Sequence, residues 1–320
     1  MSSVSSPVAS LRSWLRGSPR WNDFRAAGRE GYARVLRRRL IQRLILDTPP
    51  IRTAIDGPVE VRALTWRRDW MNLIWSLKSF YHFAGADLPL FIHDGGLTPG
   101  QTERLREHFP TATLVTTEAA DQQVAAQLRS ANAPRCADWR ARNTVTRKLF
   151  DFYAMSSADY VISIDSDIVF FRRPDLLLPG DDPPAGNRYN KDNAYFYSAT
   201  LDALEASCGV RPMPLINSGL SLIRPPTIDF QAIERWLENE SLFADGWCFE
   251  QTLHALCSTK AGVELLPDTY LVGGGTGISP DRICTHYPGV FRHFLYEEGM
   301  RHLVDTGFLQ ALRNTRGAVL

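Results

Sequence analysis

Two carboxylates, Asp165 and Asp167, stand one residue apart in a strongly apolar stretch, residues 160–171. The five residues before Asp165 do not alternate between apolar and polar side chains, which is typical of a strand buried on both faces. An ionised carboxylate in such a place needs an opposite charge, hydrogen bonds or a metal ion. Ligands of α/β sheets bind beyond the carboxyl ends of the strands. The pair therefore predicts a cleft that holds a divalent cation and the phosphates that the cation carries.

Composition agrees with an enzyme of ordinary size. A chain of 320 residues with 44% apolar residues can bury a substantial core, as one large domain or one and a half. The net charge of +1 gives the whole molecule no affinity for nucleic acid, so no nucleic-acid partner is expected. Five cysteines without a Cys-x-x-Cys pair or a secretory signal predict reduced thiols and a cytoplasmic location. No apolar run approaches the roughly eighteen residues that a membrane-spanning helix needs.

Residues 1–58 form a basic arm and a linker ahead of the main domain. Residues 1–46 carry ten Arg against Asp23 and Glu30, a net charge of +8 that leaves about −7 for the remainder of the chain. Apolar residues recur at helical spacing in residues 31–46, with arginines between them: Val35, Leu36, Leu40, Ile41 and Leu44 beside Arg37, Arg38, Arg39 and Arg43. With Trp14 and Trp21 nearby, this basic amphipathic helix could lie on an anionic membrane surface. Docking on the chain's own domain is the interpretation we prefer.

Residues 59–310 are expected to form one doubly wound α/β domain, followed by a tail at 311–320. Strands are predicted at 59–64, 89–93, 113–115, 160–164, 195–198, 219–223, 263–266 and 283–287. Helices are predicted from Thr65, as an N-cap, to 81, and at 98–108, 121–129, 144–155, 229–239, 249–257 and 289–308. Residues 179–193 and the glycine-rich residues 273–277 are expected to be loops. This alternation predicts a mainly parallel central sheet, with a smaller part beside it.

Five features in order make the Asp-x-Asp pattern more specific than it is alone. They are Lys148-Leu149, Asp165-Ser166-Asp167, Asn217-Ser218-Gly219, Glu250-Gln251, and His286 followed six residues later by Arg292. Together they resemble the GT-A fold of nucleotide-sugar-dependent glycosyltransferases, in particular the retaining branch with glycogenin and the lipopolysaccharide galactosyl- and glucosyltransferases. The resemblance runs from about residue 59 to about residue 303.

The resemblance implies a metal-dependent transfer of a hexose from a nucleoside diphosphate sugar, most simply a UDP-sugar, to a saccharide or another hydroxyl acceptor. Asp165, Asp167 and His286 match the family's metal ligands, and mixed carboxylate and imidazole ligation favours Mn²⁺ over Mg²⁺. Arg292, where relatives usually have lysine, would grip the diphosphate in bidentate fashion.

The remaining residues match positions that contact the donor or support the reaction. Thr65 and Trp66 would line the base pocket, and Lys148 would reach the phosphate or the sugar of the donor. Asp165 would also touch the ribose, Ser166 would contact the nucleotide sugar, and Asn217 and Ser218 would bind the sugar. Gln251 or Asn217 would steady the oxocarbenium-like sugar, and Glu250, where relatives mostly have Asp, would be the candidate base if the enzyme inverted instead.

Each of these residues also has a plain structural interpretation. Lys148 could be a solvated helix lysine, Asn217 an Asx turn and Glu250 an acid placed for the helix dipole. Two functional alternatives also remain open. Asp165 could be the nucleophile of a haloacid-dehalogenase-like phosphatase, although about a hundred residues of α/β pattern precede it. The chain could also bind sugar nucleotides without catalysis.

Overall fold

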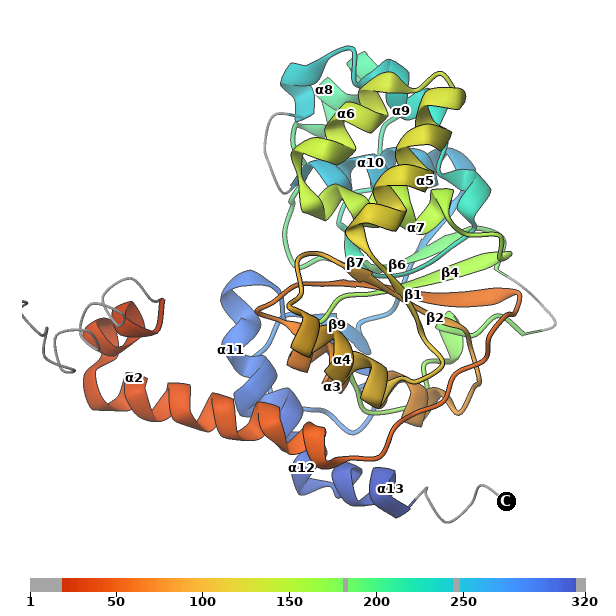
Figure 1. Cartoon of the computed structure of the whole chain (residues 1–320). Coiled ribbons are helices and arrows are strands. Elements are labelled where there is room, and N and C mark those ends of the chain that lie inside the picture. Colours follow the sequence, from red (N-terminus) through yellow and green to blue (C-terminus); the bar gives the residue numbers. More distant parts are fainter. Residues whose placement is uncertain (1–18, 181–183, 244–247, 315–320) are drawn as a thin grey trace, which may run out of the picture.

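A seven-stranded sheet forms the centre of the computed structural model, which describes residues 19–180, 184–243 and 248–314 (Figure 1). Its strands lie in the order β3-β2-β1-β4-β7-β6-β8. Their bounds are β1 (Val59–Thr65), β2 (Leu90–Asp94), β3 (Thr113–Val115), β4 (Tyr160–Ile164), β6 (Asn187–Lys191), β7 (Ile216–Ile223) and β8 (Val263–Leu265). Every neighbouring pair is parallel except the two that β7 makes, with β4 and with β6. The predicted mainly parallel α/β sheet is therefore confirmed, with β7 as its one reversed strand.

A smaller sheet continues directly from the end of β4. It consists of β5 (Ile168–Phe170), β10 (Cys284–His286) and β9 (Tyr270–Val272), in that order. β10 runs antiparallel to β5, and His286 lies opposite Ile168. Because only residues 165–167 separate β4 from β5, this register carries His286 to the two carboxylates.

Helices cover both faces of the large sheet (Figure 1). One face is covered by α5 (Thr117–Ser130), α6 (Pro134–Arg142), α7 (Arg147–Ala154), α8 (Leu201–Cys208), α9 (Phe230–Trp236) and α10 (Cys248–Ala261). The other is covered by α3 (Trp70–Ala84) and α4 (Pro99–His108), with α11 (Arg292–Phe294), α12 (Met300–Asp305) and α13 (Phe308–Asn314) nearby. Along β4, Val161 joins one hydrophobic core and Ile162 the other. The side chains on both faces of β4 are apolar for this reason, and the sequence of the strand does not alternate between apolar and polar residues.

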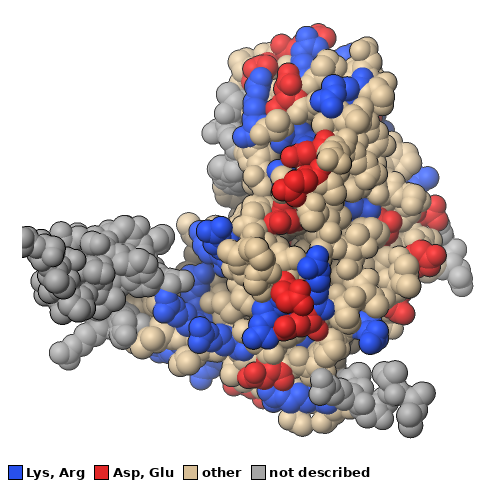
Figure 2. All heavy atoms as spheres, viewed as in Figure 1, with Lys and Arg blue, Asp and Glu red and all other residues tan. Residues whose placement is uncertain are grey.

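The basic arm forms the long helix α2 (Pro19–Arg43), which bends at Gly28, where φ is 58°. Its end lies on α3: Gln42 Nε2 donates to Asn72 Oδ1 at 2.7 Å, and Trp75 Nε1 donates to the Gln42 carbonyl at 3.1 Å. Arginine side chains, blue in Figure 2, lie along this helix. The preferred docked interpretation of residues 31–46 is thus supported by these contacts. Trp14 and the side chain of Trp21 lie outside the described part of the chain.

A buried lysine on α3 binds the start of the linker between the basic arm and β1. Lys78 on α3 donates to Thr48 Oγ1 at 2.8 Å and to the Pro49 carbonyl at 2.6 Å. Burial without a carboxylate partner lowers the pKa of Lys78 to about 7. Among the described residues, no helix has the length and apolar character to cross a bilayer.

Several predicted elements are wrong. Thr65 does not cap a helix; it is the last residue of β1, paired with Asp94, and Asp69 is the N-cap of α3. No strand forms at 195–198, and β6 lies inside the predicted loop 179–193. The polar sequence of β6 looks like a loop, but the buried amide of Asn187 is paired by other elements: its Nδ2 donates to Ser258 Oγ at 2.9 Å and to Thr227 Oγ1 at 2.8 Å. Helices α6 and α8 and strand β9 were not expected at all.

Candidate active site

A cleft opens beyond the carboxyl end of β4. Every residue predicted for the site lines it except Thr65: Trp66, Lys148, Asp165, Ser166, Asp167, Asn217, Ser218, Glu250, Gln251, His286 and Arg292. Thr65 is 1% exposed and lies behind the wall. The structure therefore brings together residues that are far apart in the sequence and come from both sheets and three helices.

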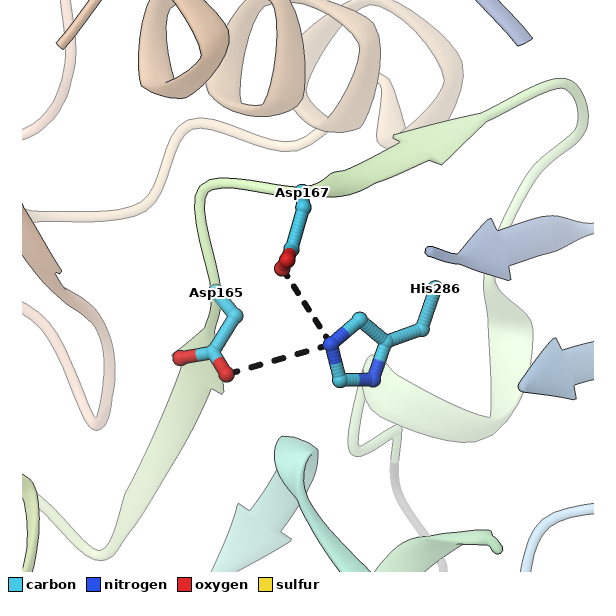
Figure 3. Close-up of side chains that lie close together, drawn as sticks. All are labelled: Asp165, Asp167 and His286. Carbon is cyan, nitrogen blue, oxygen red and sulfur yellow. Dashed lines mark ion pairs between the residues drawn. The ribbon is translucent and has the colours of Figure 1, made fainter. Parts of the chain in front are cut away.

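Asp165, Asp167 and His286 converge on one point of this cleft (Figure 3). His286 Nε2 lies 3.2 Å from Asp167 Oδ1 and 3.9 Å from Asp165 Oδ2. One ligand atom from each of the three residues can be chosen so that all lie within 4.8 Å of one another. Two carboxylate oxygens and an imidazole nitrogen are a donor set that suits a divalent cation such as Mn²⁺.

The orientation of His286 is fixed by a chain of hydrogen bonds. Asn217 Nδ2 donates to the carboxylate of Asp192 at 3.0 Å, so the Asn217 oxygen has to face His286. His286 Nδ1 lies 2.9 Å from that oxygen and donates to it. Nε2 is then the ring nitrogen that faces the two acids, where a cation would bind it in place of a proton.

Gly219 makes room for the imidazole ring. A Cβ atom at Gly219 would lie 2.2 Å from His286 Cε1, closer than any real contact. The glycine in the Asn217-Ser218-Gly219 sequence is therefore needed for a close approach of backbone and side chain, not for an unusual backbone angle.

The two neighbouring acids have different electrostatic environments. Burial opposes the charge of Asp167, but His286 and Arg292 outweigh this and hold the pKa of Asp167 below its usual range. Burial raises the pKa of Asp165, against the opposing effect of Lys148, and the charge of Asp167 raises it further. A cation between the two carboxylates would relieve their repulsion, and in this respect the residues fit a metal ion.

Lys148 lies on α7 with its ammonium in the cleft wall. Its Nζ is 2.8 Å from Asp165 Oδ1 and 3.8 Å from Glu250 Oε1. Burial disfavours the ammonium, but these carboxylates outweigh it and raise the pKa of Lys148. The lysine is therefore a fixed positive charge, not the solvated helix residue of the plain structural interpretation.

Glu250, at the start of α10, is held on several sides. Ser218 Oγ donates to Glu250 Oε2 at 2.7 Å, and His254 Nε2 lies 3.1 Å from Oε1. Burial raises the pKa of Glu250, but Lys148 and His254 outweigh this and lower it to about 2. A carboxylate with so low a pKa is a poor general base near neutral pH.

Gln251 and Asn217 share a partner behind the cleft. Gln251 Nε2 donates to Asp192 Oδ2 at 3.3 Å and to the Phe196 carbonyl at 3.2 Å. Its Oε1 accepts from the Ser218 backbone at 3.3 Å. Asp192, which is 5% exposed, thus holds the side-chain amides of Asn217 and Gln251, the two residues predicted from the sequence to stabilise the sugar.

On the opposite wall, Arg292 bridges two acids. Its Nη2 donates to Asp167 Oδ2 at 2.6 Å, and its Nη1 donates to Asp69 Oδ2 at 3.0 Å. The same Asp69 oxygen accepts from Trp66 Nε1 at 3.0 Å. Gly95 lets the Trp66 ring approach, because a Cβ there would lie 2.9 Å from a ring carbon.

Three residues that hold the site were missed from the sequence: Asp69, Asp192 and His254. Asp69 stands just before a helical pattern, where an acid is expected to cap the helix. Asp192 belongs to a polar stretch that looks like a loop, and His254 is one polar residue of an apolar helix. Only the tertiary contacts distinguish them from ordinary capping, loop and core residues.

No protein-family model matches the chain, and no curated protein matches it either. Among solved structures, the galactosyltransferase LgtC, solved with donor and acceptor sugar analogues, gives a TM-score of 0.50 at 11% identity. That match covers 77% of this chain and 95% of LgtC.

Two further solved structures are similar at lower scores. The bifunctional glycosyltransferase WbbM has a TM-score of 0.47 at 15% identity, over 75% of this chain but only 47% of that longer chain. Mouse xyloside xylosyltransferase 1 has a TM-score of 0.46 at 12% identity, over 77% of this chain and 94% of its own length. Identities this low concern the fold alone. The chain has the mixed α/β fold of the GT-A glycosyltransferases.

Proposed function

We propose that this chain is a metal-dependent glycosyltransferase that moves a hexose from a nucleoside diphosphate sugar to a saccharide or another hydroxyl acceptor. The observation that carries the proposal is the convergence of Asp165, Asp167 and His286 beside Arg292 and Lys148 in one cleft. Three ligands of a cation next to two fixed positive charges suit a diphosphate leaving group. UDP as the nucleotide and Mn²⁺ as the ion, with Mg²⁺ as the alternative, are the donor and cofactor that we favour.

Bound at this site, a divalent cation would act as a Lewis acid that neutralises a departing diphosphate. The chain itself adds Arg292, whose planar guanidinium can contact two phosphate oxygens, and the buried ammonium of Lys148. Both charges are held in place by carboxylates before a donor arrives, so little reorganisation is needed when negative charge develops. Trp66 would border the base, with the buried Thr65 behind it, and Ser166 would border the ribose.

Retention of configuration is the outcome that we favour. An inverting enzyme needs a general base, and Glu250 is engaged by Lys148, Ser218 and His254 with a pKa of about 2. Gln251 keeps a carbonyl lone pair at the cleft, which makes it the better candidate to steady a positively charged sugar. We assign Asn217 chiefly to holding His286, because its amide is already bonded to His286, Gly219 and Asp192.

Calorimetry of the purified chain with uridine, guanosine and cytidine diphosphates, with and without Mn²⁺, tests this proposal. We expect Mn²⁺-dependent binding of uridine diphosphate, and slow hydrolysis of a UDP-sugar when no acceptor is present. Nucleotide binding that is equally tight without metal would overturn the metal site. Tight metal-dependent binding with no hydrolysis or transfer of any donor would instead indicate a non-catalytic sugar-nucleotide-binding protein.

We propose in addition that α2 contacts an anionic membrane surface, and the two faces of this helix favour it. Leu36, Leu40 and Leu44 recur every four residues and are 41%, 67% and 38% exposed. Arginines 37, 39 and 43 are exposed beside them, and no ion pair of theirs is found within the described residues. The sequence placed Ile41 on the same apolar face as these leucines, whereas in the structure Ile41 packs on the domain.

An exposed leucine stripe flanked by arginines suits the boundary between anionic headgroups and acyl chains. Flotation with phosphatidylglycerol vesicles and with neutral phosphatidylcholine vesicles tests it. Binding to the anionic vesicles alone, released by salt and abolished by Leu40→Gln, is expected. If Leu40→Gln instead converts a dimer into a monomer and leaves flotation unchanged, the stripe faces a second copy of the chain.

A further inference from the structure

We infer that Asp69 is a positioning residue that holds Arg292 and Trp66 together at the diphosphate-binding wall of the cleft. The inference rests on the proposed function and extends it to a residue that does not itself line the cleft. In this role, Asp69 keeps Trp66 at the base site and Arg292 at the diphosphate site in fixed positions relative to each other.

The first observation is that Asp69 does not do what its position predicts. It is the N-cap of α3, where an aspartate side chain normally accepts a hydrogen bond from a backbone N–H of the first turn. No such capping bond is formed by Asp69. The carboxylate turns instead toward the cleft wall, and at 1% exposure it is fully removed from water.

The second observation is what the carboxylate contacts. Its Oδ2 accepts from Arg292 Nη1 and from Trp66 Nε1, both at 3.0 Å. Its Oδ1 is buried without a hydrogen bond, and the nearest cation there is the exposed Arg68, whose Nε is 3.5 Å away. A buried carboxylate is costly unless it is paired, so the pair with Arg292 is a strong constraint on both groups.

The third observation is the competition for Arg292. The guanidinium bridges Asp69 and Asp167, and Asp167 is also a candidate metal ligand. When a cation and a diphosphate occupy the cleft, the contact between Arg292 and Asp167 can be lost. The cation then pairs with Asp167, and the diphosphate pairs with Arg292. Asp69 does not line the cleft, so its contact keeps the guanidinium at the wall, with the other nitrogens available to phosphate oxygens.

Positioning and simple electrostatics predict opposite effects of removing the Asp69 charge. By Coulomb's law alone, loss of a negative charge near an anion site strengthens anion binding. If Asp69 positions Arg292, its loss weakens anion binding although a repelling charge is gone. The sign of the change therefore separates the two roles.

The experiment is calorimetry of Asp69→Asn with uridine diphosphate and with inorganic pyrophosphate, both at saturating Mn²⁺. We expect about tenfold weaker binding of both probes, and no weakening when Asp69→Asn is made in an Arg292→Ala background, where there is nothing to position. Asp87→Asn removes the same charge at the other end of α3, where Asp87 is exposed, and is expected to change neither affinity.

Unchanged or tighter binding by Asp69→Asn would overturn the inference, as would an equal loss with and without Arg292. Asp69→Ser is the second variant if the first does not fold, because serine is a favoured N-cap and preserves the start of α3. Thermal unfolding of each variant checks the fold. A wild-type chain that binds pyrophosphate but no nucleoside diphosphate would refute only the proposed donor. In that case the comparison of Asp69→Asn with and without Arg292→Ala, measured with pyrophosphate, would still decide the role of Asp69.

Discussion

His286 Nδ1 and Asn217 Oδ1 lie 2.9 Å apart, and this contact determines which imidazole nitrogen faces the two acids. The Asn217 amide cannot turn round, since its nitrogen is committed to Asp192 at 3.0 Å. The tautomer that binds a metal through Nε2 is therefore selected before any cation arrives. The orientation of the His286 imidazole is therefore fixed by Asn217, a residue of strand β7.

Asn217→Ala is expected to weaken Mn²⁺ binding by roughly 10–100-fold, because the imidazole loses the partner that orients it. Titration of Mn²⁺ followed by electron paramagnetic resonance measures this without any substrate. The control is Asn190→Ala, which removes the residue paired with Asn217 on the neighbouring strand and should leave the affinity within about threefold. Equal effects of the two substitutions would show that a disturbed sheet, not the lost contact, is responsible.

The sequence predicted the ends of strands and helices far better than the partners of individual side chains. Asp165 is predicted because it ends an apolar strand, whereas Lys148 and His286 are predicted only from their match to positions of the glycosyltransferase family. The pairing of Asp69 with Arg292 joins residues more than two hundred positions apart, and periodicity contains no information about such pairs.

The failure at β6 has a similar origin. Its asparagines resemble a loop, and the hydrogen bonds that make burial of the Asn187 amide acceptable come from residues of other elements. Thr65 was taken for a cap because a hydroxyl precedes an apolar pattern, but the strand continues through it and the helix begins five residues later, at Trp70.

Glu250→Gln is expected to lower the free energy of unfolding at pH 7 by about 3 kcal/mol, from a pKa of about 2 in the folded chain against an ordinary 4.5. A folded-state pKa below the unfolded value means that this stabilisation is present above about pH 4.5 and is lost as the pH falls toward 2. The difference between the two proteins should therefore shrink across that window in urea denaturation curves.

Glu264→Gln is the matched control for this pH dependence. Glu264 pairs with Arg188 at 2.9 Å but its side chain is 50% exposed. A loss of less than about 1 kcal/mol is expected there. A pH-independent difference for Glu250→Gln would show that Glu250 is not held as a buried carboxylate in solution.

Two truncations test how much the end of α2 adds to the stability of the domain. Removal of residues 1–46 deprives Asn72 and Trp75 of their partners on Gln42 and removes the buried Ile45, which should cost several kcal/mol of stability. Removal of residues 1–30 leaves these contacts intact and should leave the melting temperature within about 3 °C. Equal melting temperatures for both truncations would mean that the end of α2 adds nothing to the domain.

Arg292→Lys should be milder than Arg292→Ala in donor binding. Lysine keeps a positive charge but cannot bridge Asp69 and Asp167, nor contact two phosphate oxygens in one plane. We expect roughly a tenfold loss of uridine diphosphate affinity for lysine and a hundredfold loss for alanine, by calorimetry. Equal losses would indicate that geometry matters and charge does not.

The last prediction separates sugar transfer from phosphate hydrolysis through His286. In a transferase His286 shares one cation with Asp165 and Asp167, so His286→Ala should weaken Mn²⁺ binding and transfer together while the chain stays folded. Asp167→Asn should do the same, because an amide is a poorer ligand than a carboxylate for a hard cation. His293→Ala, which removes an exposed histidine beside Arg292, is the control and should keep full activity.

In a phosphatase of the haloacid-dehalogenase kind, His286 has no role, and Asp165 forms a phosphoryl-aspartate intermediate. Borohydride reduces an aspartyl phosphate to homoserine, so borohydride treatment during turnover, followed by mass spectrometry of the peptide that contains Asp165, detects such an intermediate. The glycosyltransferase assignment gives Asp165 no covalent role, so no phosphorylated Asp165 is expected. Full activity of His286→Ala together with a trapped Asp165 would refute the glycosyltransferase assignment.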